Sequence, residues 1–517
     1  CDTNMAERQV SAAELALHDK PGNLWLAIDG DVYDVSKFAN LHPGGAKVLE
    51  ELGGKDVTEE FYELHRHEVL TKYEKLKVGR LEGSQSKVTG IKGVPFAEIP
   101  AFQGQESPFY TDSHKRFREG MQSFVDAELA PIAAARDLKG EYPTRDLQRR
   151  LGQSGVMASR MGPGPWLAEL SQLQIALPGN IDPKDVDYFH EAIAHQEIAR
   201  IGLPGFVDSL GAGYLISTPA IYHFGPEWMR KLGAELLQGQ KWSALAISEP
   251  FAGSDVAQIK ATARKTPDGK QFVVNGVKKW ITEGAYADYF VTAVRTGGAG
   301  AAGISLLMVE RGEGVSTSQM KTAYSACAGT ALVVLDDVLV PVENLLGKEN
   351  EGFKLIMYNF NHERWFICQI LLGQMRAALA DAFMWARQRK VFGKPLIEQA
   401  VIRNKLASSV AALESVQSYN EVLTYDMSKS KHGPVGARLA GAIAMFKYQS
   451  TRTAWKIADD TVQILGGRGV TQTGMGAKIT GLKNFAKYAA VYGGSEEIMA
   501  DLAIKQALRM FPSTARL

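Results

Sequence analysis

The spacing of apolar and polar residues divides most of the chain into helical and strand-rich stretches. Apolar residues recur every three or four positions within 117–129, 147–151 and 186–201, which predicts amphipathic helices. Short runs rich in Val, Ile and Phe follow from Trp242 and predict β-strands, and from Gly352 the spacing is helical again. We therefore expect three successive domains: a helical domain over 107–241, a β-domain over 242–350 and a helical domain over 351–514.

The first 85 residues follow a different pattern. Residues 25–35 predict a hairpin that turns at Asp29-Gly30, and His42-Pro-Gly-Gly45 precedes a predicted helix over 46–52. Thr58 begins another helical segment, which ends at His65. The sequence therefore predicts a small α+β domain over 5–84. Residues 85–106 are polar and contain Gly and Pro, which is typical of a linker.

Composition narrows the class of protein. The 517 residues carry a net charge of +1, with 45% hydrophobic and 22% charged residues. These values are typical of a soluble globular protein and do not predict nucleic-acid binding. No apolar run reaches the roughly 18 residues of a membrane span. Cys1, Cys327 and Cys368 lack CxxC spacing, which argues against disulfides, zinc or an iron–sulfur cluster and fits a reducing compartment.

Two segments of the predicted β-domain are candidates for ligand binding. They are Leu245-Ala-Ile-Ser-Glu-Pro-Phe-Ala-Gly-Ser-Asp255 and Lys278-Lys-Trp-Ile-Thr282. Between them, Asn275-Gly276 predicts the tight turn of a β-hairpin. Small residues let backbone amides approach a flat ligand, hydroxyls can bond its heteroatoms, and Trp280 can pack on its face. Ordinary turn chemistry is the alternative interpretation.

One carboxylate falls on an apolar helix stripe. Ile356, Phe360, Glu363, Ile367 and Ile370 recur at steps of four and three, so they share one face of the predicted helix. A buried carboxylate has a raised pKa and can accept a proton near neutral pH. Glu363 is therefore a candidate general base, and an ion pair with the following arginine is the alternative.

Two histidines of the first domain are candidate metal ligands. His42 is fixed by Pro-Gly-Gly, and His65 follows 23 residues later. Two neutral imidazoles can fill both axial positions of a haem iron, which suits electron transfer rather than oxygen chemistry. His67 is the alternative second ligand. The whole segment resembles the cytochrome b5-like haem domain, which implies haem b held by His42 and His65.

The remaining chain resembles the acyl-CoA dehydrogenase family over about 106–510. Both β-domain segments match, as do 385–394 and 462–467. The resemblance implies a helical domain, a β-barrel-like domain and a C-terminal helical bundle, with FAD as cofactor and acyl-CoA as substrate. Its implied FAD contacts are Leu245, Ile247, Ser248, Gly253, Trp280, Ile281, Thr282, Arg389, Phe392, Gln463, Gly466, Gly467, Ser495 and Glu497. Its implied substrate contacts are Ser254, Asn361 and Arg364.

The resemblance also supports the choice of base. Most members take it from a Tyr-Glu-Gly-Thr segment, but this chain reads Tyr492-Gly-Gly-Ser495, with Gly493 at the base position. Long-chain and isovaleryl members instead place a Glu before a helix arginine, as in Asn361-His-Glu-Arg364. This selects Glu363, with Glu496 and Glu497 as competitors.

Two positions depart from the family pattern. Gln399 lies one residue before the expected position, which puts its FAD contact in doubt. The segment 324–330 lacks the usual arginine, which puts substrate-side details in doubt.

The resemblance implies oxidation of a fatty acyl-CoA to the trans-2-enoyl-CoA in β-oxidation, with electrons passing from FAD to the haem. The alternatives are an oxidase that uses oxygen and a non-catalytic haem- and flavin-binding sensor or scaffold. We expect a homodimer or homotetramer with shared FAD sites, in which Arg389 contacts a neighbour's FAD. The external acceptor would be an electron-transferring flavoprotein, a cytochrome or oxygen. Ala515-Arg516-Leu517 resembles a peroxisomal address, with cytoplasm or mitochondrial matrix as alternatives.

Overall fold

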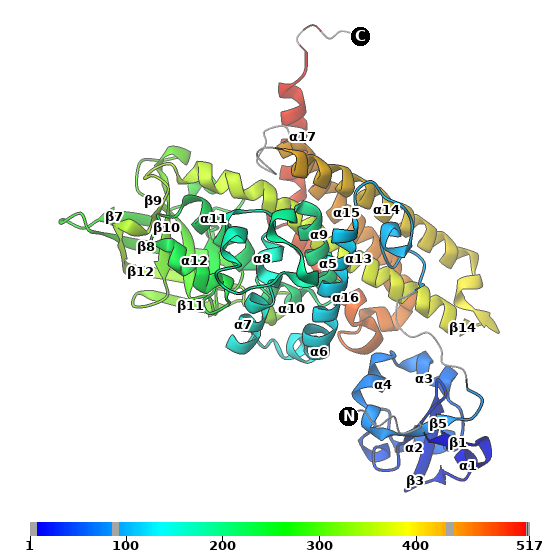
Figure 1. Ribbon diagram of the computed structural model, residues 1–517. Coiled ribbons are helices and arrows are strands. Elements are labelled where there is room, and N and C mark those ends of the chain that lie inside the picture. The colour runs from blue at the N-terminus through cyan, green and yellow to red at the C-terminus, as the bar shows by residue number, and fades with distance from the viewer. Residues whose placement is uncertain (1–7, 85–92, 431–438, 513, 515–517) are drawn as a thin grey trace. The chain divides into compact units, whose positions relative to one another are not determined.

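The computed structural model describes residues 8–84, 93–430, 439–512 and 514 (Figure 1). The expected targeting tripeptide at 515–517 lies outside these residues. The chain forms two compact units. One contains Cys1–Ala97 and Ala380–Asn404, and the other contains Glu98–Leu379 and Lys405–Leu517.

The N-terminal part of the first unit is built on a five-stranded sheet of order β1-β5-β4-β3-β2. Its strands are β1 (Gln9–Val10), β2 (Asp19–Lys20), β3 (Asn23–Ile28), β4 (Asp31–Asp34) and β5 (Lys77–Leu81). The predicted hairpin is confirmed, because β3 pairs with β4 around Asp29 and Gly30, whose φ angles are +53° and +82°. Its helices are α1 (Ala12–Ala16), α2 (Ala46–Leu52), α3 (Thr58–Leu64) and α4 (Glu68–Lys72).

The two faces of this sheet bury different residues because side chains alternate along a strand. Leu24, Leu26 and Ile28 of β3 join the core that α2 and α3 cover. Trp25 and Ala27 pack on the opposite face. Helices α2 and α3, which lie next to the two histidine motifs, therefore pack on a continuous core on this face of the sheet.

The second unit begins with helices. They are α5 (Asp112–Phe124), α6 (Ala130–Lys139), α7 (Arg145–Gln153), α8 (Val156–Arg160), α9 (Tyr188–Ala199), α10 (Pro204–Ser209), α11 (Ala212–Phe224) and α12 (Met229–Leu237). A five-residue π-helix, Val125–Leu129, joins α5 to α6. Helix α9 is buried nearly all round, so its polar residues must find partners inside the protein.

An eight-stranded sheet follows, with strand order β11-β12-β8-β7-β9-β10-β13 and β6 beside β9. Figure 1 shows its long strands gathered at one end of the second unit. The strands are β6 (Ser243–Ala246), β7 (Thr262–Lys265), β8 (Gln271–Ile281), β9 (Tyr289–Arg295), β10 (Ile304–Glu310), β11 (Val315–Gln319), β12 (Ala331–Pro341) and β13 (Leu345–Leu346).

The predicted hairpin at Asn275-Gly276 is wrong, because both residues lie inside the continuous strand β8. The Asn275 amide side chain donates to Asp337 Oδ1 at 2.8 Å and accepts from Asp337 N at 2.9 Å. This pairing spans a register shift in β12. Asn275 therefore supports a β-bulge, and the turn before β8 uses Gly269 instead, at φ +72°.

Long helices complete the chain. They are α13 (Gly352–Gln388), α14 (Ala400–Lys429), α15 (Leu439–Leu465), α16 (Ala477–Ala489) and α17 (Glu496–Arg509), with the short hairpin β14 (Lys390–Val391) and β15 (Lys394–Pro395) after α13. Helix α13 is long and apolar enough to cross a membrane, but 94% of its most apolar window is buried inside the protein, as in a core helix. The order helices, sheet, helices is as predicted.

Candidate active site

The carboxylate of Glu363 lies in the interior, on the first half of α13. Glu363 is 8% exposed, and its Oε2 atom has no hydrogen-bond partner among the described residues. Burial raises the pKa of Glu363 to about 7, while the nearby charges of Arg364 and Lys447 oppose that rise. The predicted apolar stripe is confirmed, since Ile356 and Ile367 are 3% and 0% exposed. The result is a desolvated carboxylate that titrates near neutral pH.

The loop after α16 leaves space for this carboxylate. Gly493 has φ +62°, and a Cβ built on it would lie 2.6 Å from Ile367 Cδ1 and 3.5 Å from Glu363 Oε1. Arg364 Nε donates to Gly493 O at 3.4 Å, and Arg364 Nη1 donates to Asn361 Oδ1 at 3.3 Å. The structure therefore brings Glu363, Arg364 and Asn361 together beside Gly493.

A buried lysine holds the same loop, and the sequence analysis missed it. Lys447 of α15 is fully buried, and its Nζ donates to Ala489 O at 2.9 Å and to Gly494 O at 2.7 Å. Burial lowers the pKa of Lys447 to about 8, and Glu363 is among the groups that oppose this shift. Its burial could have been inferred from helical spacing, because Lys447 lies between the buried residues Ile443 and Thr451 of α15.

The competing carboxylates have other neighbours. Glu496 lies in the first turn of α17, where Thr451 Oγ1 donates to its Oε2 at 3.4 Å and Arg452 Nη1 lies 3.7 Å from its Oε1. Glu497 is exposed in the same turn. Neither forms a hydrogen bond with the Glu363 cluster among the described residues.

The two β-domain segments meet as the sequence suggested. Lys279 N donates to Ser248 O at 2.9 Å, and Lys278 Nζ donates to Ile247 O at 3.0 Å. The fully buried Lys278 also donates to Glu249 Oε1 at 2.8 Å. Glu249 in turn accepts the amides of residues 260 and 261 at 2.6 and 2.9 Å. A buried ion pair therefore fixes the spacing of the two segments.

Trp280 and Gly253 leave room for a flat ligand at this junction. Trp280 has φ +69°, a costly conformation for a large side chain, and its indole is 52% exposed. A Cβ built on Gly253 would meet nothing within 4 Å. An exposed aromatic face beside open backbone fits the isoalloxazine of FAD. Ile281 is buried and fixes the end of β8.

The other predicted FAD residues lie in turns and at helix ends. Phe392 is 95% exposed between β14 and β15, and Arg389 directly precedes β14. Gln463, Gly466 and Gly467 end α15 in an exposed turn, and a Cβ on either glycine would meet nothing within 4 Å. The remaining positions are Leu245 at β6, Thr282 after β8, the exposed Ser254 next to Gly253, and Ser495, which caps α17.

The histidine pair of the first unit fits haem. The His42 and His65 ring centroids are 5.9 Å apart. Imidazoles on opposite sides of one metal ion, each with a bond of about 2 Å, place their centroids roughly 6 Å apart. His42 Nδ1 lies 3.3 Å from Gly45 O and His65 Nδ1 lies 3.2 Å from Phe61 O. Each Nδ1–H can donate to its carbonyl, which leaves both Nε2 atoms for iron.

His67 is engaged elsewhere in that domain. Its Nδ1 lies 2.8 Å from Tyr62 Oη and 3.9 Å from Asp29 Oδ2. The ring therefore pairs with the Tyr62 side chain, whereas His42 and His65 face each other.

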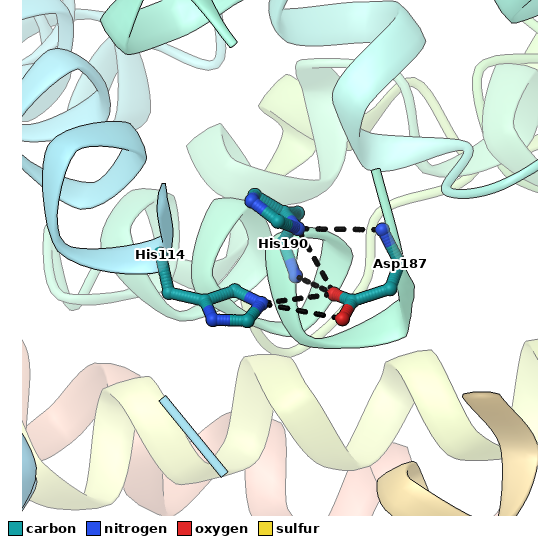
Figure 2. Close-up of side chains that lie close together, drawn as sticks. All are labelled: His114, Asp187 and His190. Atoms are coloured by element: carbon teal, nitrogen blue, oxygen red, sulfur yellow. Dashed lines mark hydrogen bonds and ion pairs between the residues drawn. The ribbon is translucent and has the colours of Figure 1, made fainter. Parts of the chain in front are cut away.

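A second histidine cluster lies in the helical domain (Figure 2). Asp187 Oδ1 lies 3.1 Å from His114 Nε2 and 2.9 Å from His190 Nδ1, and both histidines are nearly fully buried. Three such side chains could hold a metal ion. However, His114 Nδ1 accepts the Thr111 amide at 2.9 Å, so its Nε2 carries the proton donated to Asp187 and has no lone pair for a metal. The cluster caps α5 and α9.

Comparisons with known proteins agree with this geometry. The acyl-CoA dehydrogenase N-terminal, middle and C-terminal domain models match residues 111–163, 244–338 and 350–508. The cytochrome b5-like heme/steroid binding domain model matches residues 11–82.

Individual relatives are similar over most of their length. Acyl-CoA dehydrogenase apdG of Emericella nidulans is 38% identical over 81% of this chain and 97% of that protein. Mitochondrial isovaleryl-CoA dehydrogenase of Oryza sativa is 28% identical over 71% of this chain and 85% of that protein. The solved structure of butyryl-CoA dehydrogenase from Megasphaera elsdenii has a TM-score of 0.68 and 26% identity, and the match covers 78% of this chain and 100% of that one.

The ion pair between Lys278 and Glu249 gives the first prediction. Lys278→Met removes the cation and leaves a buried carboxylate without its charged partner, which typically costs about 3–5 kcal/mol. We expect lower FAD content in the purified protein and a lower midpoint of thermal unfolding. Lys270→Met, at an exposed turn position, is the control and should change neither value. Full FAD retention in Lys278→Met would show that the pair does not organise the two segments.

Proposed function

Because the chain belongs to the acyl-CoA dehydrogenase family and carries a cytochrome b5-like domain, we propose that Glu363 is the catalytic base of its FAD-dependent acyl-CoA dehydrogenation. The proposal rests on one observation: a buried carboxylate, whose Oε2 has no hydrogen-bond partner in the described part of the chain, lies beside a glycine at the family's usual base position. Glu363 would remove the α-proton of the thioester. FAD, when bound, supplies the acceptor for the hydride that leaves the β-carbon.

The residues around Glu363 support this role. A general base works best when its pKa lies near the working pH, and burial brings the pKa of Glu363 to about 7. The α-proton becomes acidic only when charge on the thioester oxygen is stabilised, so the substrate must be held by hydrogen-bond donors. We propose Ser254, Asn361 and Arg364 as substrate contacts, since the last two lie next to the base.

The site residues divide between two cofactors and two subunits. We propose that the two β-domain segments hold the FAD ring, and that Arg389 and Phe392 reach the FAD of a second subunit in a homodimer or homotetramer. The exposure of Phe392 supports this arrangement. We propose His42 and His65 as the ligands of haem iron, because the two rings lie 5.9 Å apart and each is oriented by a carbonyl at its Nδ1.

We propose a fatty acyl-CoA as substrate, with the trans-2-enoyl-CoA of β-oxidation as product. An oxidase and a non-catalytic sensor are the alternatives, and one experiment separates all three. Acyl-CoA is added to the enzyme without oxygen while flavin absorbance is followed. A sensor leaves the flavin oxidised, whereas both enzymes bleach it. Admitting oxygen then produces rapid reoxidation and peroxide only in an oxidase.

Replacement of the base is the second prediction. Glu363→Gln keeps the size of the side chain and removes the proton acceptor, so flavin bleaching by acyl-CoA should slow by about 10²–10⁴-fold. FAD and haem contents should stay unchanged. Glu351→Gln, at the exposed residue just before α13, should bleach at the wild-type rate. A loss smaller than about tenfold in Glu363→Gln would make Glu496 or Glu497 the better candidate.

The haem ligands give the third prediction. His42→Ala and His65→Ala should each remove the six-coordinate low-spin spectrum, because each deletes one axial nitrogen. His67→Ala should keep that spectrum, since His67 contacts Tyr62. Absorbance spectra of the purified oxidised proteins provide the measurement. Loss of the spectrum in His67→Ala, with retention in His65→Ala, would reverse the assignment.

We also propose that the haem receives electrons from the dehydrogenase site of the same assembly. The haem domain is part of the same chain as the dehydrogenase domains, and covalent tethering of this kind gives an effective concentration of about millimolar. Each acyl-CoA oxidised would release two electrons, and a haem held by His42 and His65 would accept one of them, so two haem groups would match one turnover. The alternative is that the haem domain and the dehydrogenase domains are fused only so that both reach the same compartment.

Anaerobic stopped-flow mixing of oxidised enzyme with excess acyl-CoA tests this relay and is the fourth prediction. Haem reduction should follow flavin bleaching with a first-order rate that does not depend on enzyme concentration. His65→Ala should bleach its flavin normally and provides the control for substrate oxidation. A haem that stays oxidised beside fully reduced flavin would end the proposal, and a rate that rises with enzyme concentration would indicate transfer between molecules.

A further inference from the structure

The residue before the proposed base forms a buried ion pair with another helix. His362 Nε2 of α13 lies 2.6 Å from Glu191 Oε1 of α9. The side chains of His362 and Glu191 are 13% and 0% exposed. The nearby charge of Glu191 raises the pKa of His362 against the effect of burial, and the charge of His362 lowers the pKa of Glu191. The 2.6 Å contact and both pKa directions favour the ionised form of each group.

Among the cations near Glu191, which include the buried Arg160, His362 makes the direct contact. The other Glu191 oxygen, Oε2, has no hydrogen-bond partner among the described residues. His195 Nε2 lies 3.6 Å from Glu191 Oε1 but donates to Arg160 O at 3.0 Å. Burial lowers the pKa of His195 to about 4, so this ring is neutral at pH 7. Only His362 brings a positive charge into hydrogen-bond contact with the carboxylate in the described part of the chain.

The backbone is closely packed around this pair. A Cβ on Gly162 would lie 1.7 Å from Glu191 Oε2, so the chain at 162 packs directly on the carboxylate. About three turns after His362, a Cβ on Gly373 of α13 would lie 2.5 Å from Gln196 O of α9. Helices α13 and α9 are thus in close contact on the C-terminal side of His362 as well.

The charged and titratable groups that face His362 come from several elements. Glu191, Tyr188 and His195 belong to α9, His223 belongs to α11, and Glu363 follows on α13 itself. Burial lowers the pKa of His223 and leaves that ring neutral, and burial raises the pKa of Tyr188. The fixed charges around His362 are therefore those of Glu191 and the ionised base.

The groups that face Glu363 are its own neighbours His362 and Arg364, Lys447 of α15, and Tyr492 of the loop after α16. Arg364 lies beside the proposed substrate site and Lys447 is engaged by two carbonyls. His362 differs from both because its charge is maintained by a carboxylate that no substrate would touch.

We propose that His362 and Glu191 form a positioning pair for Glu363, which anchors this turn of α13 to α9 and keeps a fixed positive charge beside the base. The inference rests on the proposed role of Glu363. A cation close to a carboxylate favours its ionised form. Loss of the pair should therefore move proton abstraction to higher pH, in addition to any effect on stability. A purely structural pair would change stability alone.

The test is the pH dependence of anaerobic flavin bleaching by acyl-CoA, measured with the full-length holoenzyme. In the wild type the bleaching rate should rise with pH through about 7, as Glu363 ionises. In His362→Gln the rise should move upward by on the order of one pH unit, the size expected for one neighbouring charge. In the double variant His362→Gln/Glu191→Gln it should move up by less, because the nearer positive and the more distant negative charge are both lost.

The double variant also protects the test against misfolding. It contains no unpaired buried charge, and two amides can still hydrogen-bond, so it should fold even if the single variant does not. Gln196→Leu is the matched structural control. It deletes the hydrogen bond of 3.0 Å from Gln196 Nε2 to Gln369 Oε1 between the same two helices without changing charge. Its bleaching rate should rise at the wild-type pH.

The outcomes distinguish this inference from the base assignment. A wild-type pH dependence in the double variant, with FAD bound, would overturn the positioning role and leave a structural pair. An upward shift in Gln196→Leu equal to that of His362→Gln would also overturn it, because loosened packing would then be the cause. Failure of the base assignment would appear separately, as rapid bleaching in Glu363→Gln.

Discussion

A carboxylate that is only 8% exposed has lost most of its hydration, and a protein normally compensates such a group with hydrogen bonds or an ion pair. Glu363 receives charges nearby but no hydrogen bond from the described residues. Desolvation therefore determines its pKa, and the surrounding cations keep that pKa near neutral. The loop around Gly493 and helices α15 and α9 of the second unit surround this group.

The loop around Gly493 and the helix α15 lie on one side of Glu363. Lys447 donates to two carbonyls and so fixes the loop in which Gly493 leaves space for Glu363. On the other side, α9 contributes Glu191 to His362. The base thus lies between a lysine that shapes a loop and a histidine that anchors a helix. The Lys447 and His362 side chains each have hydrogen-bond partners of their own.

The sequence predicted the burial of Glu363 because helical periodicity is a local property of adjacent turns. It could not predict Lys447 or Glu191, which lie 84 and 172 positions away and reach Glu363 only through tertiary packing. The incorrect hairpin at Asn275-Gly276 has the same cause. Asn-Gly favours a tight turn locally, but the contact of Asn275 with Asp337 on β12 makes it part of a bulge.

Three buried carboxylates of this chain show how the fold separates structural from reactive acids. Glu249 accepts hydrogen bonds from two backbone amides and from Lys278, so its role is architectural. The Glu191 carboxylate forms an ion pair with His362, and the distance from Oε1 to Nε2 is 2.6 Å. Within the ranges that the structure describes, Glu363 Oε2 has no such direct partner. A proton acceptor must keep a lone pair accessible to substrate, and every additional hydrogen bond to the ionised form would reduce its basicity. The same desolvation that would be a defect elsewhere therefore makes Glu363 suitable for proton abstraction.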